Sequence, residues 1–185
     1  MLLKISEELT LHSTQEDVWR LLRDTPRLAA LLPGVETVSP LHEPGTEAYQ
    51  AKAGDKIGPF KVALNMQIRV VETRAPAVLK AQIKGADAIG LNRLTGSLNL
   101  TLSPAPSSTL MRFEADIEIL GKLATLGAAP IRRRVTEKFA EFARNIQAQF
   151  ASDGNVHARL ETTSRSRSTT DVRAAMRTQP KKDRR

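Results

Sequence analysis

Long alternation of apolar and polar residues restricts the fold of this chain more than any other feature. From residue 60 to 71, one face collects the apolar residues Phe60, Val62, Leu64, Met66, Ile68 and Val70. From residue 111 to 119, apolar residues alternate strictly with Arg112, Glu114, Asp116 and Glu118. Because successive strand residues point to opposite faces, the pattern predicts an antiparallel sheet with one apolar face and one face in water.

Other patterned segments surround these two strands. Further strands are predicted over residues 4–11, 35–41, 48–53, 77–83 and 94–102, and two short helices follow the first strand, one capped at Ser13 or Thr14 and one from Pro26 to Leu32. A long amphipathic helix starts at Pro130, because apolar residues then recur every three or four positions as far as Phe150. This order predicts an α+β fold in which a curved sheet of about seven strands wraps around the C-terminal helix and encloses a cavity.

Charge and aromatic residues divide the chain after Ala151. All the aromatic residues precede residue 152, whereas residues 152–185 hold nine basic and four acidic residues and so carry most of the net charge of +8. We therefore predict a globular domain over 1–151 and a disordered basic tail over 152–185. The tail either only solubilises the protein or attracts an anionic membrane, a protein or a nucleic acid. Nucleic acid is the least favoured, because aromatic stacking residues are few.

Composition also excludes several classes of protein. The chain contains no cysteine, so it has neither disulfides nor thiolate metal ligands. It contains no apolar run of about 20 residues, the length that a membrane-spanning helix requires. The apolar stretch after Met1 is too short for a signal peptide. These features predict a cytoplasmic protein that is soluble or peripheral on the cytoplasmic membrane.

Three segments in order resemble one family: Leu32-Pro33-Gly34-Val35-Glu36, residues 56–61 (KIGPFK) and residues 121–127 (GKLATLG). Together they are similar to the CoxG-like family of carbon monoxide dehydrogenase subunits, a branch of the START-like (SRPBCC) helix-grip superfamily, over roughly residues 2–150. The resemblance implies a helix-grip fold with a hydrophobic cavity. It also implies an accessory role beside a molybdenum hydroxylase of the carbon monoxide dehydrogenase type, through membrane recruitment and binding of a quinone that accepts electrons. Family members often carry an apolar C-terminal membrane segment, whereas this chain ends in basic residues, which leaves only electrostatic attachment.

A search for catalytic groups finds none that the pattern supports. His12, His42 and His157 have no partner at metal or triad spacing, and Glu114, Asp116 and Glu118 fall on the polar strand face. The Gly85–Gly90 segment lacks phosphate-loop spacing and is interpreted as a loop at the cavity mouth or a simple turn. We therefore expect no catalytic residue, no metal site and no cofactor other than a bound quinone. Asn92 and Arg93 are the best polar groups for the alternative of a START-like cyclase or hydrolase.

The predicted binding residues fall into two sets. A hydrophobic ligand, such as a quinone with an aliphatic tail, is predicted to contact Leu64, Met66, Ile68, Leu94, Leu98, Phe113, Ile117, Leu123, Leu126, Val135 and Phe139. A membrane or partner surface is predicted to contact Arg132, Arg133, Arg134, Lys181, Lys182, Arg184 and Arg185. A further alternative is an adaptor whose own side chains fill the interior. The ligand, the partner enzyme and the oligomeric state are left open.

Overall fold

The computed structural model describes residues 1–174, with side chains for residues 1–151. Its first compact unit is Met1–Gln147, and a second begins at Ala148. Within the described residues the elements are β1 (Leu2–Leu11), α1 (Gln15–Arg23), α2 (Thr25–Leu31), β2 (Val35–Glu43), β3 (Thr46–Ile57), β4 (Phe60–Arg74), β5 (Val78–Ala86), β6 (Asn92–Ala105), β7 (Ser108–Gly121), the 3₁₀ helix η1 (Lys122–Leu126) and α3 (Ala128–Ala174).

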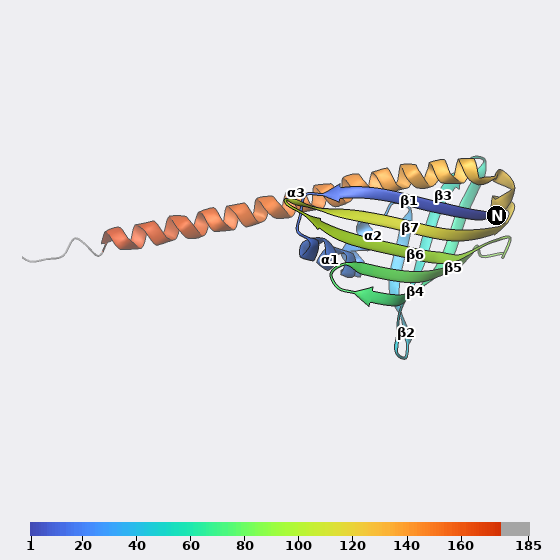
Figure 1. Ribbon diagram of the computed structural model, residues 1–185, viewed down its shortest axis with the longest axis horizontal. Helices are drawn as coiled ribbons and strands as arrows, with labels where there is room; N and C mark the ends of the chain where they lie inside the picture. Colours follow the sequence, from blue (N-terminus) through green and yellow to red (C-terminus); the bar gives the residue numbers. More distant parts are fainter. Residues whose placement is uncertain (175–185) are drawn as a thin grey trace, which may run out of the picture. The chain divides into compact units, whose positions relative to one another are not determined.

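The strands form one antiparallel sheet in the order β1-β7-β6-β5-β4-β3-β2 (Figure 1). Strands β2 to β7 are a meander of consecutive hairpins, and β1 joins its far edge by pairing with β7, Leu3 opposite Ile117 and Leu9 opposite Met111. The two short helices fill the connection from β1 to β2. The predicted helix-grip architecture is confirmed, including both short helices and the final long one.

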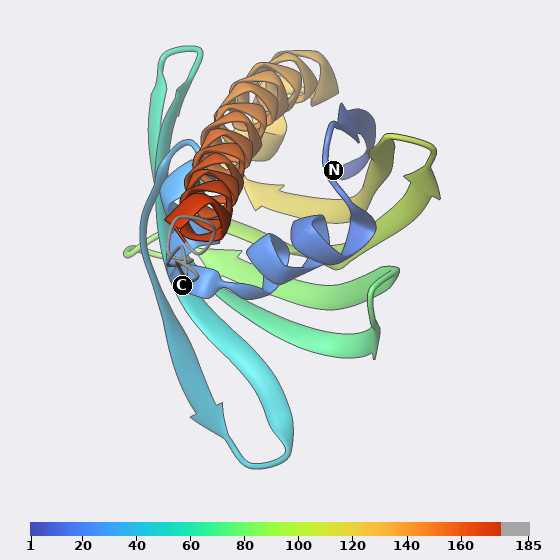
Figure 2. The same ribbon diagram turned by 90° about the vertical axis from the view of Figure 1, so that its left-hand side faces the viewer.

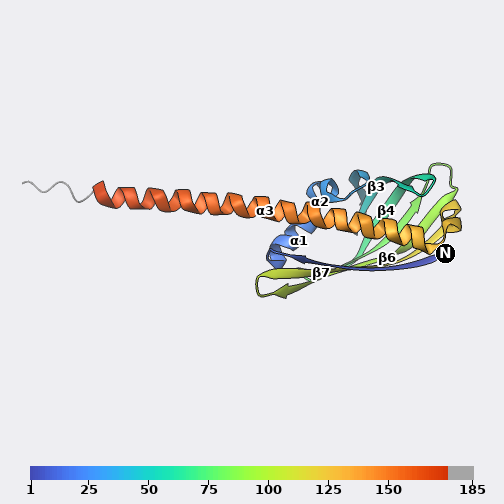
Figure 3. The same ribbon diagram turned by 90° about the horizontal axis from the view of Figure 1, so that it is seen from above.

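The sheet curves strongly around the first part of α3, which crosses its concave face (Figures 2 and 3). Gly96 in β6 contributes to the tight curvature, because a Cβ atom at this position would collide with the backbone of Asp116 and Ile117 on β7. Only a residue without a side chain allows the neighbouring strand to approach so closely. The curved sheet thus leaves room between its inner face and the straight helix.

The hydrophobic core occupies that space. Its buried members come from β1, β4, β7, η1 and α3, and they are Leu3, Ile5, Val62, Ala115, Ile119, Leu123 and Ile131. Farther along α3, Phe142 and Ile146 are buried. Because each fully buried side chain of this size contributes about 1.5–3 kcal/mol, this apolar contact holds the helix in the sheet.

The two short helices have the capping residues that start such segments. The hydroxyl of Thr14 accepts a hydrogen bond from the backbone N–H of Asp17 at 3.2 Å, and the carboxylate of Asp24 accepts one from the N–H of Arg27 at 3.2 Å. In the first unit, α3 is tied to this end of the fold by Asn145, whose side-chain amide donates to the carbonyl of Leu31 at 3.0 Å. The bond from Asn145 helps to position α3 along the concave face.

Helix α3 continues to Ala174, through much of the segment for which the sequence predicts disorder. The domain boundary after residue 151 and the role of the basic tail stay predictions. Lys181, Lys182, Arg184 and Arg185, the tail residues predicted to contact a membrane or partner, lie outside the described residues.

Candidate functional site

A cavity of about 240 Å³ lies in the first unit between the inner face of the sheet and α3. Its wall is contributed by strands from both halves of the sheet, by η1 and by the first turns of α3. The lining residues are Leu3, Ile5, Pro33, Gly34, Ala53, Gly54, Asp55, Ile57, Val62, Leu64, Asn92, Arg93, Leu94, Ile117, Ile119, Leu123, Ile131 and Val135. The lining is aliphatic apart from Asp55, Asn92 and Arg93, so the cavity suits an apolar molecule.

Five of the eleven residues predicted to contact a ligand line this cavity: Leu64, Leu94, Ile117, Leu123 and Val135. Three others, Leu98, Phe113 and Leu126, are partly buried and pack against the core cluster beside it. Met66 and Ile68 follow Leu64 on β4, and Phe139 follows Val135 on α3, outside the lining. Contact of any of these residues with a ligand stays a prediction.

Aromatic rings fill the interior next to the cavity. The rings of Phe113 on β7 and Phe139 on α3 stack with centroids 6.2 Å apart and planes 27° apart, and Phe142 lies 6.2 Å beyond Phe139. Phe139 is one helical turn after Val135, the last α3 residue of the lining. The stacked rings therefore lie beyond the lining, in the direction of the later turns of α3.

One carboxylate of the lining is held in an ion pair. Arg134 on α3 donates two hydrogen bonds to Asp55 on β3, from Nε to Oδ2 at 2.8 Å and from Nη2 to Oδ1 at 2.6 Å, and the backbone N–H of Lys56 donates to Oδ1 at 2.8 Å. The bonds from Arg134, opposed by partial burial, hold the pKa of Asp55 below its ordinary value. Asp55 is thus ionised at neutral pH and unsuited to act as a general acid.

Asn92 lies at the other polar edge of the cavity and forms hydrogen bonds to two neighbouring segments. Its Nδ2 donates to Oδ2 of Asp87 at 2.7 Å, and its Oδ1 accepts the backbone N–H of Leu123 at 2.8 Å. Oδ1 of Asp87 accepts the N–H of Leu91 at 2.8 Å. Burial raises the pKa of Asp87, but the hydrogen bonds from Asn92, Leu91 and Gly90 outweigh it, and the pKa is lowered. Both polar atoms of the Asn92 amide therefore connect the β5–β6 loop to η1.

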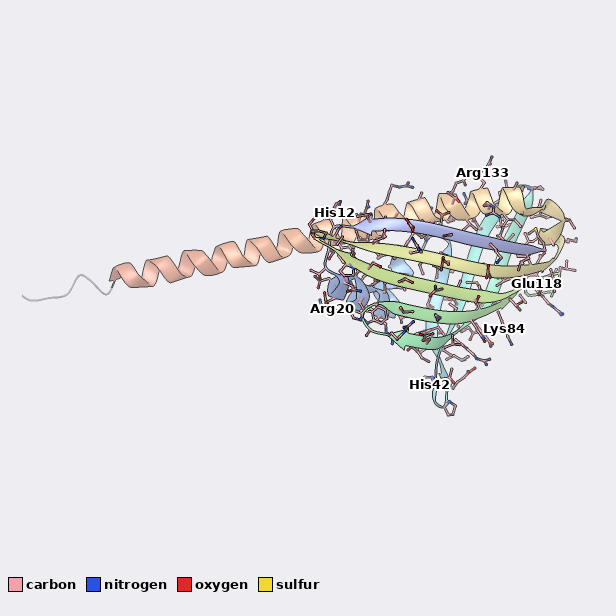
Figure 4. The ribbon with its side chains drawn as sticks, viewed as in Figure 1. His12, Arg20, His42, Lys84, Glu118 and Arg133 are labelled. Carbon is pink, nitrogen blue, oxygen red and sulfur yellow. The ribbon has the colours of Figure 1, made fainter. Side chains whose placement is uncertain are left out.

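The remaining candidates from the sequence lie on the outside. His12, His42 and Glu118 are exposed (Figure 4). Glu114 and Asp116 are exposed as well, and the side chain of His157 lies outside the described residues. No group of three or more potential metal ligands occurs in the part of the chain that the structure describes. No helix within these residues is long and apolar enough to cross a bilayer. None of these exposed groups faces the cavity lining.

The three consecutive arginines of α3 have different surroundings. Arg132 donates from Nη1 to the carbonyl of Lys4 at 2.9 Å, and Arg134 also donates to Glu137 at 2.9 Å. The Arg133 side chain is 85% exposed and approaches Glu137 at 3.4 Å. Arg132 is also exposed, whereas Arg134 is half-buried and joins the helix to β3.

The sequence of this domain matches a known family. Residues 8–151 fit the profile of the family described as the CoxG subunit of carbon monoxide dehydrogenase. The chain belongs to the CoxG family. The match includes all the strands except the first residues of β1, and it ends where the described side chains end. No match was found among the curated proteins.

Solved structures of low sequence identity share the CoxG-family fold. A conserved protein from Geobacillus kaustophilus has a TM-score of 0.72 at 22% identity, with 81% of this chain and 96% of that one covered. A START superfamily protein from Mycobacterium smegmatis has a TM-score of 0.58 at 10% identity, covering 79% and 95%. Truncated norcoclaurine synthase from Thalictrum flavum has a TM-score of 0.57 at 15% identity, covering 81% and 94%. Because the last of these is named as an enzyme, the fold by itself does not decide whether a member is catalytic.

Proposed function

We propose that this protein is a non-catalytic accessory protein that holds a hydrophobic ligand, a membrane quinone, in the cavity and serves a molybdenum hydroxylase of the carbon monoxide dehydrogenase type. One observation carries the proposal: the cavity lining is aliphatic, and its one carboxylate, Asp55, is neutralised by Arg134. An acid or base poised for catalysis needs a free protonation site within reach of a bound substrate. The side-chain polar atoms of Asp55 and Asn92 instead form hydrogen bonds within the fold.

The size of the cavity indicates that the ring of a quinone, rather than its long tail, is the part that the cavity holds. Its volume is about 240 Å³, whereas an apolar cavity of about 150 Å³ already binds benzene and drug-sized ligands occupy about 300–1,000 Å³. A substituted quinone ring with the start of its tail fits this space. The rest of a polyprenyl tail then extends out of the cavity, or the helix shifts to admit it.

The partner is inferred from family membership. The family description names carbon monoxide dehydrogenase, and we propose that the enzyme served is a molybdenum hydroxylase of that type that passes its electrons to a quinone. A protein that brings a quinone to such an enzyme needs a pocket for the quinone and no chemistry of its own. The aliphatic cavity and the ion-paired state of its one carboxylate support both parts of this proposal.

The first experiment is identification of the bound molecule. The protein is purified without detergent and extracted with organic solvent, and the extract is analysed by mass spectrometry for a quinone in stoichiometric amount. The emptied protein is then titrated with a water-soluble short-chain quinone by calorimetry. We expect saturable one-to-one binding. Absence of a quinone in the extract together with absence of binding in the titration would contradict the proposal and favour the adaptor.

A further inference from the structure

Exposed apolar side chains are concentrated at one end of the first unit. Within residues 1–151, five large apolar side chains are exposed: Leu2 (65%), Val71 (57%), Ile89 (76%), Leu91 (44%) and Leu120 (51%). All but Val71 belong to the start of β1, the β5–β6 loop or the end of β7. These segments meet at the end of the sheet where Figure 1 marks the N-terminus. An apolar group of this kind on a protein surface indicates an interaction site.

The strand register makes three of the four apolar residues neighbours. Leu2 lies opposite Glu118, so it is the diagonal neighbour of Leu120 on the outer face of the sheet. Leu120 in turn lies opposite Arg93 on β6. The backbone of Leu91 closely approaches that of Gly121, since a Cβ atom on this glycine would collide with the Leu91 carbonyl. Ile89 continues the group into the loop, two residues before Leu91.

Cations without ion-pair partners flank this apolar group. Lys84, Arg93 and Lys122 are exposed, and none of them makes an ion pair within the described residues. Some cations elsewhere on the sheet are paired, as Arg112 is with Glu8. Figure 4 shows Lys84 at the same end of the sheet as Glu118. We call the set of Leu2, Ile89, Leu91, Leu120, Lys84, Arg93 and Lys122 the mouth surface.

The cavity reaches the mouth surface. Arg93 belongs to both the mouth surface and the lining, and Leu123 of the lining directly follows Lys122. Asn92 bonds both to Asp87 in the β5–β6 loop and to the N–H of Leu123 in η1. Displacement of the loop that carries Ile89 would therefore be transmitted through Asn92 to the cavity wall.

We propose that the mouth surface docks on an anionic lipid bilayer, with Ile89 and Leu91 inserted among the lipids and Lys84, Arg93 and Lys122 at the phosphates. Apolar side chains flanked by unpaired cations are complementary to such an interface. A protein partner is less well matched, because a stable protein interface uses about 20–30 residues on each side, and the mouth surface is a narrow loop and strand end. The inference rests on the proposed function for its purpose, since docking here would place the cavity where a membrane quinone could pass into it.

The test uses a fluorescent reporter of insertion. The chain contains no cysteine, so an Ile89→Cys variant of the full chain carries a single nitrobenzoxadiazole label. With vesicles of phosphatidylcholine and phosphatidylglycerol that contain no quinone, we expect a blue shift and a several-fold rise in fluorescence, weakened by salt. The matched control is the same label on a Val71→Cys variant, whose site is also exposed but lies outside the mouth surface. Absence of a response at Ile89, or an equal response at Val71, would overturn the proposal.

A charge-reversal pair separates the mouth surface from the basic tail, which is identical in all variants. Changing Lys84→Glu should weaken vesicle binding by roughly tenfold, because each basic residue near an anionic surface contributes to the attraction. Lys52→Glu, at an exposed cation on β3 outside the mouth surface, should have a smaller effect. Equal losses in the two variants would assign the binding to overall charge and contradict docking by this surface.

The two proposals fail separately. Insertion of the Ile89 label, together with no quinone in the extract and no binding in the titration, would leave docking in place and contradict the carrier function. Two other outcomes would leave the carrier function in place but contradict docking of the mouth surface on a bilayer. The first is a bound quinone without insertion of the label, and the second is a response of the label only in a complex with the hydroxylase.

Discussion

Asp55 on β3 and Arg134 on α3 join the sheet to its helix across 79 residues of sequence, through two hydrogen bonds of 2.6 and 2.8 Å at the rim of an aliphatic cavity. The ion pair satisfies the one carboxylate of the lining, and it fixes the second turn of the helix over β3. A charged group at the rim thus serves the fold, while the interior is left to apolar side chains. This arrangement is typical of a binding cavity rather than of an acid–base site.

Replacing Asp55→Asn should make folding stability less dependent on pH in acid. The folded pKa of Asp55 is lowered by Arg134, and the unfolded value is about 4. Its contribution to stability is therefore complete above about pH 4 and is lost as the pH falls through the folded pKa. The melting temperature of the wild type should exceed that of the variant by a few degrees at pH 7, and the difference should shrink below pH 4. A difference that stays constant down to pH 2 would contradict the assignment.

Filling the cavity from β4 should weaken ligand binding while preserving the fold. In the Leu64→Phe variant the larger ring occupies space that a quinone ring would need, so we expect the affinity for a short-chain quinone to fall at least about tenfold, equivalent to about 1.4 kcal/mol. Ile68→Phe is the matched control, because Ile68 lies on the same face of the same strand but outside the lining. Calorimetric titration measures both, and equal affinities for the two folded variants would place the ligand elsewhere.

The elements of this fold can be predicted from the sequence better than the cavity can. Alternation identifies which residues of β4 face inward, but Leu64 lines the cavity whereas Met66 and Ile68 do not. The difference depends on where the straight helix crosses the curved sheet, and a pattern of period two holds no information on that crossing. Val62 and Ile119 share the alternation of their neighbours and also line the cavity, but nothing local distinguishes them as site residues.

The long-range contacts of charged side chains also cannot be predicted from the sequence. Arg134 is grouped there with Arg132 and Arg133 as a basic cluster for a membrane or partner, because cations near a helix N-terminus are unfavourably placed and so suggest an external anion. In the fold, Arg134 lies beside Asp55, and Arg132 donates to the carbonyl of Lys4. Both contacts exist only once α3 has packed against strands from distant parts of the chain.

Replacing the ring of Phe139 with a smaller side chain should change the length of the quinone tail that the cavity accepts. The stack of Phe139 with Phe113 lies beyond the lining, and Phe139→Leu removes it and should open space from the cavity toward Phe142. We expect a loss of about 1–3 kcal/mol in the free energy of unfolding and a gain in affinity for quinones with one or two more prenyl units relative to short-chain ones. Phe142→Leu removes a buried ring farther along the helix and should lower stability without changing this preference. The same shift of preference in both variants would contradict a specific effect of Phe139 on the length of the cavity.

Alanine substitution at two glycines should separate the cost of a steric clash from the cost of backbone strain alone. Gly121 and Gly45 both have positive φ, 92° and 71°, but a Cβ atom at Gly121 would collide with the Leu91 carbonyl, whereas one at Gly45 meets nothing within 4 Å. Gly45→Ala should therefore cost only the strain of its φ, about 1–3 kcal/mol. Gly121→Ala should cost more than about 4 kcal/mol or prevent folding, because the end of β7 would have to separate from the start of β6. Urea denaturation measures both, and equal losses would show that the approach of Leu91 to Gly121 is not required.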